Sequence, residues 1–136
     1  NTDIGVFSCG QYYRNQNDLV LSVTDFGKGI PRNVRSFLRH KDVDEAQILK
    51  LSGADCLKWA FKPGSTTCTG DVPRGLGLDL LKEFVRLNQG KLEVYSNNAY
   101  AIVDKDGEQF VNSDLSFEVG LMAINYTMQA EVILKE

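Results

Sequence analysis

The sequence predicts an α+β fold, with helices on one face of a mostly antiparallel, mixed β-sheet, as a two-layer α/β sandwich. Alternating apolar segments lie near the start of the chain and again after residue 90, whereas helical spacing is confined to the region between them. Strands grouped apart from helices are typical of this class rather than of repeated βαβ units. The 136 residues suffice for one core, so we expect residues 1–136 to form a single domain.

The first half of the chain predicts a β-hairpin and three short helices. Residues 3–26 contain two segments rich in β-branched and aromatic residues, separated by the turn-forming sequence RNQND. Helical spacing then begins at Pro31, resumes after the sequence DVDE, and returns over residues 53–61 (GADCLKWAF).

A long loop and a long helix follow. Residues 62–76 (KPGSTTCTGDVPRGL) are rich in Gly, Pro, Ser and Thr, and long loops inside compact domains are typically lids or binding loops. We expect residues 62–74 to be mobile when no ligand is bound. The helix after this loop is predicted to end at Gly90. Its residues at helical spacing are Leu78, Leu81, Phe84, Val85 and Asn88.

The remainder of the chain predicts strands. Residues 91–96 (KLEVYS) alternate between apolar and polar, and residues 99–113 are predicted to form a hairpin around the turn sequence KDGE. The alternation of residues 126–134 predicts a last strand there.

The composition disfavours several classes of function. The formal net charge is −3 and there is no basic run, which argues against nucleic acid or an anionic membrane surface as a partner. No apolar segment is long enough to span a membrane, and no signal-peptide pattern occurs. Cys9, Cys56 and Cys68 lack metal-binding spacing, so we expect free thiols in a cytoplasmic protein. The chain begins with Asn1 and enters a strand almost at once, which suggests a piece of a longer protein.

The sequence LVLSVTDFGKG places an aspartate and two glycines at the end of a predicted strand. Asp25 is in phase with Leu21 and Val23, on the face that helices are expected to cover, where an ionised carboxylate needs hydrogen-bond donors. Gly27 and Gly29 permit positive φ and the close approach of a planar ligand. The exocyclic amine of a purine would satisfy Asp25. A plain glycine turn, with Asp25 bonded to backbone amides, remains an equally good interpretation at this point.

A second pair of glycines, Gly75 and Gly77, stands where the long loop enters the long helix. A helix N-terminus exposes N–H groups that bind phosphate, and Arg74 and Lys62 would offset the negative charge. The pattern is neither a Walker A loop nor a dinucleotide fingerprint. A helix start that binds nothing also fits this pair alone.

In this order, the motifs resemble those of one family. DFGKGI (25–30) is similar to a first glycine box, DxGxG[IV], and WAFKPGSTT (59–67) to the segment that enters an ATP lid. RGLGLDLLKEFVRLNQGKLEVYS (74–96) is similar to a second glycine box with its helix and next strand. Over residues 4–97 the chain resembles the ATP-binding domain of the GHKL superfamily, which includes histidine kinases, anti-sigma serine kinases, type II topoisomerase subunits and Hsp90-like chaperones.

The resemblance implies a Bergerat-type sandwich that binds ATP. Asp25 would accept a hydrogen bond from the adenine amino group, Gly29 would pack against the base, and the turn at Gly75 and Gly77 would hold the phosphates. The residues carried over from the motifs are Asp25, Gly27, Gly29, Ile30, Lys62, Thr66, Thr67, Arg74, Gly75, Leu76, Gly77 and Leu78. The expected function is that of the ATP-binding domain of a histidine-kinase-like or anti-sigma-type protein kinase. The alternatives are a non-catalytic nucleotide-binding or regulatory protein-interaction module, and a structural domain without a ligand.

The chain departs from the family pattern at its start, because no N box precedes the first strand. That helix carries a Glu and the Mg²⁺-coordinating Asn, so no catalytic or metal-binding residue is assigned and weak ATP·Mg²⁺ binding is expected. Without the helix, apolar residues of the sheet should be uncovered, among Ile4, Val6, Leu19, Leu21 and Val23, and the fragment should self-associate. His40 is interpreted as a solvated surface residue, so the phosphoacceptor is unassigned. The expected partners are other domains of the same polypeptide or a signalling protein.

Overall fold

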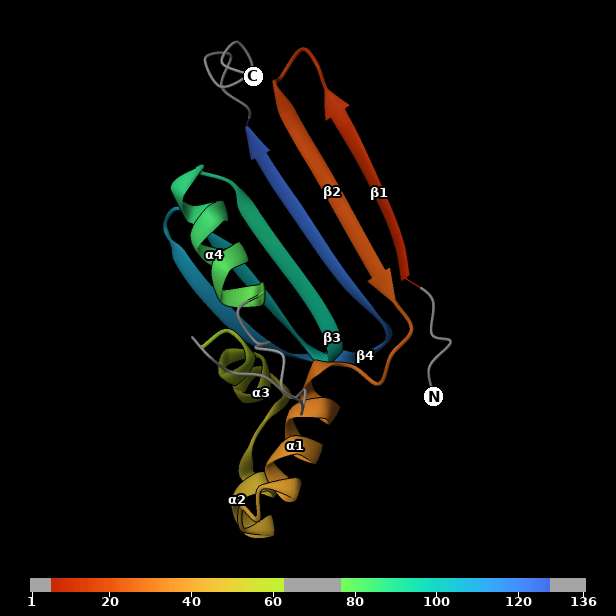
Figure 1. Cartoon of the computed structure of the whole chain (residues 1–136), viewed down its shortest axis with the longest axis vertical. Helices are drawn as coiled ribbons and strands as arrows, with labels where there is room; N and C mark the ends of the chain where they lie inside the picture. The colour runs from red at the N-terminus through yellow and green to blue at the C-terminus, as the bar shows by residue number, and fades with distance from the viewer. Residues whose placement is uncertain (1–5, 63–76, 128–136) are drawn as a thin grey trace, which may run out of the picture.

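The computed structural model describes residues 6–62 and 77–127, and for Val6, Asp25, Gly77 and residues 118–127 it describes the backbone alone. The described elements are, in order, β1 (Val6–Tyr13), β2 (Asp18–Asp25), α1 (Ile30–His40), α2 (Glu45–Lys50), α3 (Gly53–Ala60), α4 (Gly77–Leu87), β3 (Lys91–Asp104) and β4 (Gly107–Thr127). The predicted α+β class is confirmed, and so are the four helices that the sequence predicts between the strands, although α1, predicted to be short, is as long as α4 with 11 residues (Figure 1).

The strands form one sheet in the order β1-β2-β4-β3, and every described pairing is antiparallel. The predicted first hairpin is confirmed, because β1 and β2 pair without a register shift from Val6↔Asp25 to Tyr13↔Asp18. The strand between β2 and β3 is β4, which includes residues 116–125, where the sequence analysis places no strand. Its apolar run LMAI does not alternate, and periodicity does not distinguish such a run from a buried helix. The predicted last strand at 126–134 lies mostly outside the described residues.

Strand β3 bends sharply in its middle. The rings of Tyr95 and Tyr100 stack with centroids 5.6 Å apart, whereas five residues of a straight strand span roughly 16 Å. The pairing with β4 shifts register on both sides of Asn97, whose φ is 51°. The second half of β3 therefore runs back beside the first half, and it pairs with the start of β4 in the hairpin that the KDGE turn predicts (Figure 1).

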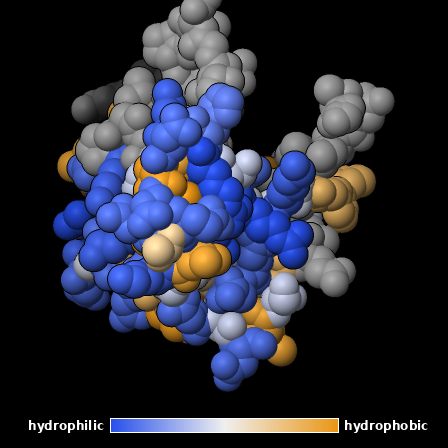
Figure 2. All heavy atoms as spheres, turned by 90° about the horizontal axis from the view of Figure 1, so that it is seen from below, coloured by the Kyte–Doolittle hydropathy of each residue, from blue (hydrophilic) through white to orange (hydrophobic). Residues whose placement is uncertain are grey.

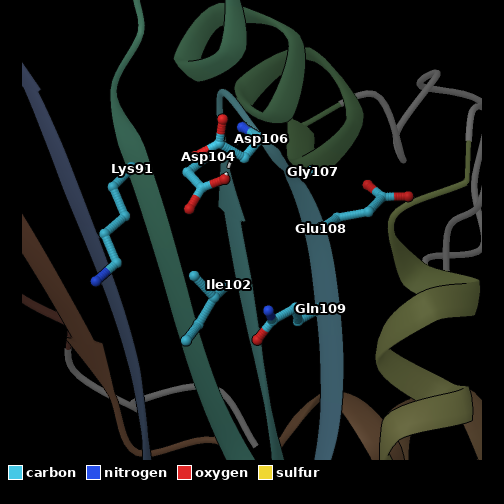
Figure 3. Close-up of a pocket in the computed structure, with 7 residues that line it drawn as sticks. All are labelled: Lys91, Ile102, Asp104, Asp106, Gly107, Glu108 and Gln109. Carbon is cyan, nitrogen blue, oxygen red and sulfur yellow. Dashed lines mark hydrogen bonds between the residues drawn. The ribbon is translucent and has the colours of Figure 1, made fainter.

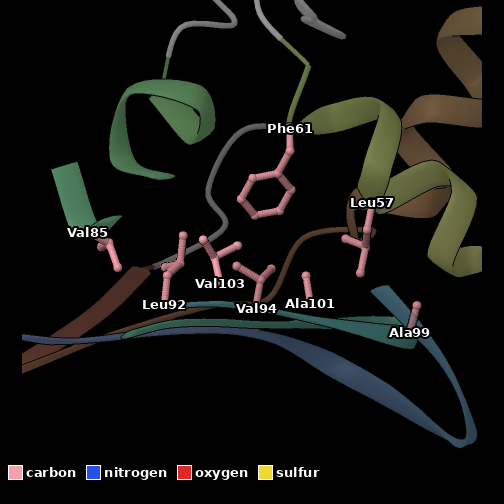
Figure 4. Close-up of a cluster of buried hydrophobic side chains, with 8 residues drawn as sticks. All are labelled: Leu57, Phe61, Val85, Leu92, Val94, Ala99, Ala101 and Val103. Atoms are coloured by element: carbon pink, nitrogen blue, oxygen red, sulfur yellow. The ribbon is translucent and has the colours of Figure 1, made fainter. Parts of the chain in front are cut away.

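The core lies between this bent strand and the helices. Its members are Leu57, Phe61, Val85, Leu92, Val94, Ala99, Ala101 and Val103. Figure 4 shows the β3 members pointing from one side of the sheet toward α3 and α4. Ile30 and Leu78, two residues carried over from the glycine motifs, pack against the same cluster. Both therefore have a packing role that needs no ligand.

The ends of the helices show which local signals the sequence carries. Helix α3 begins with a capping box, in which the Ser52 hydroxyl accepts from the Asp55 N–H and the Asp55 carboxylate accepts from the Ser52 N–H. Helix α4 ends differently from the prediction, because Gln89 rather than Gly90 takes the left-handed conformation, with φ 55°. The Gly90 N–H donates to the Val85 carbonyl at 2.8 Å, so Gly90 follows the left-handed residue.

Helix α4 has two apolar sides, and only one of them is buried. Val85 is fully buried, but Phe84, which the sequence predicts on the same face, is 44 % exposed. Phe84 instead shares an exposed stripe with Leu80 and Leu87. Both sets of residues have helical spacing, so spacing alone does not tell which set faces the sheet.

The helices cover only part of the sheet. Figure 1 shows α4 over β3, while no helix lies over β1 and β2. Leu21 is 38 % exposed, and Leu19 and Val23 are half-buried. The prediction of uncovered apolar residues is confirmed for Leu21. Ile4 lies outside the described residues, as does the side chain of Val6.

Helices α1 and α2 form one end of the molecule (Figure 1). The surface at this end is mostly hydrophilic, with separate hydrophobic spots (Figure 2). His40 is exposed in the last turn of α1, as predicted. Among the described helices, none has the length and apolar character needed to cross a membrane.

Candidate functional site

The pairing of the strands fixes which face of the sheet each position of β2 occupies. Val94 is buried beneath the helices and pairs with Met122, which in turn pairs with Val23. Directly paired residues share a face, so Val23 occupies the helix-bearing face. Asp25 follows two residues later in the same unbroken ladder, opposite Gly120. The predicted register position of Asp25 is therefore confirmed, although its side chain lies outside the described part of the chain.

The loop after Asp25 is held by the bend of β3. The Ile30 N–H donates to the Ser96 hydroxyl at 2.8 Å, and the Arg32 N–H donates to the Asn97 side-chain oxygen at 3.3 Å. The Asn97 side-chain nitrogen donates to the Lys28 carbonyl at 3.0 Å. Two N–H groups in the first turn of α1, which has no side-chain cap of its own, are thus satisfied from β3.

Sequence reasoning missed Ser96 and Asn97 as partners of the glycine loop. Their only local signal is the polar sequence SNN inside an apolar strand, which is typical of a turn. The turn is indeed there, but its partner lies more than sixty residues earlier in the chain. Spacing along the sequence carries no information about such a contact.

Gly29 has a structural reason to be glycine. Its φ is 95°, and a Cβ at this position would overlap the side-chain amide of Asn97. The same contact explains the residue without a bound base, so the ligand-free interpretation of this glycine gains support. Gly27 and Ile30 complete the turn between β2 and α1, and Ile30 is the first residue of that helix.

The start of α4, which follows the second glycine motif, lies toward the same end of the sheet as the end of β2, which precedes the first. Helix α4 runs opposite to β2, so its first residue, Gly77, lies toward the end of the sheet where β2 finishes at Asp25 (Figure 1). Leu78 follows and is half-buried, and Lys62 is exposed after α3. The remaining predicted residues, Thr66, Thr67, Arg74, Gly75 and Leu76, lie outside the described residues, as does most of the predicted lid.

A separate pocket of about 450 Å³ lies at the β3–β4 turn (Figure 3). It is lined by Lys91, Ile102, Asp104, Asp106, Gly107, Glu108 and Gln109. Glu108 also forms an ion pair of 3.5 Å with Lys82 of α4. None of the residues predicted for the site contributes to this pocket, and no group of three or more His, Cys, Asp or Glu side chains in residues 6–62 and 77–127 is arranged to hold a metal ion.

Two of the charged residues that line this pocket, Lys91 and Glu108, form ion pairs. The Lys91 ammonium lies 2.9 Å from the Glu93 carboxylate, and this hydrogen-bonded pair raises the pKa of Lys91.

Two of the three cysteines are described and both are free thiols, with Cys9 exposed and Cys56 buried. Desolvation raises the pKa of the Cys56 thiol, which disfavours the reactive thiolate.

The candidate site is therefore the end of the helix-bearing face where β2 finishes and α4 begins. No protein-family model matches the chain, and no curated protein compared with it is similar in sequence. The motifs and the geometry of this end of the sheet are therefore the features that indicate a function.

Proposed function

We propose that residues 1–136 form the ATP-binding domain of a histidine-kinase-like or anti-sigma-type protein kinase, built as a two-layer sandwich of the Bergerat type. The observation that supports the proposal is that β2 ends and α4 begins toward the same end of the sheet. Asp25 occupies a position on the helix-bearing face at the end of β2, and α4 begins toward that end. These two positions are more than forty residues apart in sequence, so their arrangement is a property of the fold.

Asp25 and the start of α4 each offer chemistry that suits one part of ATP. A carboxylate at Asp25 would accept a hydrogen bond from the adenine amino group, and the amides at the start of α4 would bind phosphate oxygens. Lys62 and Arg74 would offset part of the phosphate charge. Asp79, in the first turn of α4, opposes an anion there, so the glycine turn and the two cations must outweigh it.

The uncovered half of the sheet fits the place of an N-box helix. Lys82 reaches Glu108 on one side of α4, and residues two apart on a helix lie about 200° around its axis. Phe84 therefore projects from the opposite side, and it shares this side with the exposed Leu80 and Leu87. Leu21 on β2 and this stripe on α4 are two exposed apolar surfaces that one more amphipathic helix could cover. In the proposed family such a helix supplies the Asn that binds Mg²⁺, which phosphoryl transfer requires.

The test compares two aspartates at opposite ends of β2. Asp25→Asn should weaken ATP binding about fivefold or more, because leaving a polar group mispaired costs roughly 1–3 kcal/mol. The control, Asp18→Asn, makes the same change at the far end of the strand and should leave the affinity unchanged. Titration calorimetry on the polypeptide that contains residues 1–136 measures both affinities, and thermal melting confirms that both variants fold.

The outcomes separate the alternatives. Equal ATP affinity of wild type and Asp25→Asn contradicts the proposed base pocket. ATP binding without hydrolysis or transfer of its γ-phosphate, in a protein that carries its upstream sequence, identifies a non-catalytic nucleotide-binding module. A protein that binds no adenine nucleotide under any condition is a structural or interaction domain.

A further inference from the structure

Strand β1 forms an edge of the sheet and is exposed along its whole described length. Among residues 6–62 and 77–127 it pairs with β2 on one side only, without a bulge, and all its residues from Phe7 to Tyr13 are exposed. The outward edge therefore presents a regular row of backbone N–H and C=O groups. Such a row is a template for another strand.

The usual devices that protect an edge strand are missing from β1. Its sequence, VFSCGQYY, contains no lysine, no proline and no charged residue of any kind. Natural edge strands are commonly blocked by these residues or by a bulge. Phe7 is 67 % exposed and Tyr12 and Tyr13 are each 42 % exposed, so the strand also offers apolar area.

We propose that β1 pairs with β1 of a second copy of this chain, antiparallel across a twofold axis, so that the two sheets become one. The observation for a second copy, rather than an unrelated peptide, is that the edge complements itself. The strand is uncharged, so its copy meets no like charge. A twofold axis also places the outward N–H and C=O groups of β1 antiparallel to the same groups of the second copy. Each outward N–H group then faces a carbonyl acceptor.

The side chains of β1 select the register of this pair. Alternate residues direct their backbone groups to the same edge, so some residue must lie opposite its own copy on the axis. With Gly10 on the axis, Phe7 lies opposite Tyr13 of the second copy, and the twofold axis repeats this pair, so the dimer has two of them. With Cys9 on the axis, Phe7 would instead meet Gln11. Cross-strand aromatic pairs are the more stabilising, so we assign the Gly10 register.

Existing contacts already position these rings for pairing. Phe7 packs edge-on against Phe26 with centroids 5.7 Å apart, and the Tyr13 hydroxyl donates to Gln11 at 3.2 Å. Less side-chain entropy is then lost on association. A pair of single strands is still a smaller contact than the roughly 1,200–2,000 Å² of a standard interface, so the dimer is expected to be concentration-dependent.

Sedimentation velocity over a concentration series of the 136-residue chain tests the dimer. Gln11→Lys places a charge on each copy of the edge and should raise the dimer dissociation constant about tenfold or more. Gln47→Lys makes the same change on the exposed surface of α2 and should have no effect. A chain that stays monomeric throughout, or an equal response to the two variants, would overturn the proposal.

Cross-linking tests the register independently. In the Gly10 register the two Cys9 residues are diagonal neighbours about 7–8 Å apart, too far for a disulfide but within reach of a short bis-maleimide. With Cys68 replaced by Ser and Cys56 buried, Cys9 is the thiol that reacts. Mass spectrometry should then find a Cys9–Cys9 cross-link that Gln11→Lys diminishes and Gln47→Lys preserves. A dimer that lacks this cross-link does not form through β1, and the proposal fails.

Discussion

Asn97 occupies the bend of β3 with a φ of 51° and directs its side-chain amide at the glycine turn between β2 and α1. Asparagine tolerates the left-handed conformation better than most residues. Its amide both donates to the Lys28 carbonyl and accepts from the Arg32 N–H. One side chain therefore fixes the turn that follows Asp25, so the conformation of this turn does not depend on a ligand bound at Asp25.

At this scale we predict that Gly29→Ala destabilises the fold more than Gly107→Ala does. Both glycines have positive φ, 95° and 145°, so both substitutions carry backbone strain of roughly 1–3 kcal/mol. Only at Gly29 does the new methyl group also displace Asn97, whereas no atom lies within 4 Å of a Cβ at Gly107. Urea unfolding of both variants measures the difference. Equal losses of stability would show that the Asn97 side chain moves away from the new methyl group without a loss of unfolding free energy.

Among the elements, α3 has the clearest electrostatic signature. Its capping box lowers the pKa of Asp55 below the ordinary 3.8, chiefly because the carboxylate accepts the backbone N–H of Ser52. A carboxyl group with a depressed pKa adds stability that is fully present above its unfolded pKa and is lost as pH falls through the folded pKa.

We therefore predict that wild-type stability declines below about pH 4 in part through Asp55, and that Asp55→Asn makes this acid decline shallower. The same substitution should lower stability at neutral pH, where the ionised carboxylate is the better acceptor. Thermal melts at a series of pH values check both effects. Parallel pH profiles for the two proteins would mean that the capping box does not contribute to acid sensitivity. Asp44→Asn is a suitable control, because Asp44 is the N-cap residue of α2 but its exposed side chain forms no capping hydrogen bond.

Helix α4 yields a prediction from two residues on its two apolar sides. Val85→Ala removes methyl groups from a fully buried site and should cost roughly 1.5–3 kcal/mol of unfolding free energy. Leu87→Gln changes a side chain of the exposed stripe that is itself 80 % exposed, and it should alter stability by less than about 0.5 kcal/mol. Urea denaturation separates the two. A large loss with Leu87→Gln would show that something already covers the stripe, for instance a second copy.

The elements also show what the sequence can and cannot predict. The first hairpin and the helices follow from periodicity within ten or so neighbouring residues, and the register position of Asp25 follows from alternation along β2. Residues 116–125 of β4 were not predicted as a strand, because the apolar run there lacks a period. The inward side of α4 was assigned incompletely, because Phe84 and Val85 belong to two stripes with the same spacing. The partnership of Asn97 with the glycine turn is non-local, so no local pattern contains it.

For the whole molecule, the distribution of buried residues is uneven. The fully buried apolar side chains belong to the helices, to β3 and to the residue just after α3, and none of the described residues of β1 or β2 is among them. The hairpin of β1 and β2 is joined to the rest of the sheet through β4 alone. Few buried contacts and exposed backbone hydrogen bonds are the properties of a region that opens at low free energy.

We accordingly predict that the backbone amides of β2 exchange with solvent faster than the β3 amides that lie under α4. Native-state hydrogen exchange read by mass spectrometry resolves the two segments, and the free energy of opening should be lower for β2 at dilutions where the chain is monomeric. Leu21→Gln should change this difference little, because Leu21 is already partly in water, whereas Leu92→Ala should lower the protection of β3. If a polypeptide with the upstream sequence brings a helix onto the uncovered half, the β2 amides should gain protection and the β3 amides should change little. Equal protection of β2 and β3 in the 136-residue chain would contradict this account, because it would mean that the sheet opens as one unit despite its one-sided core.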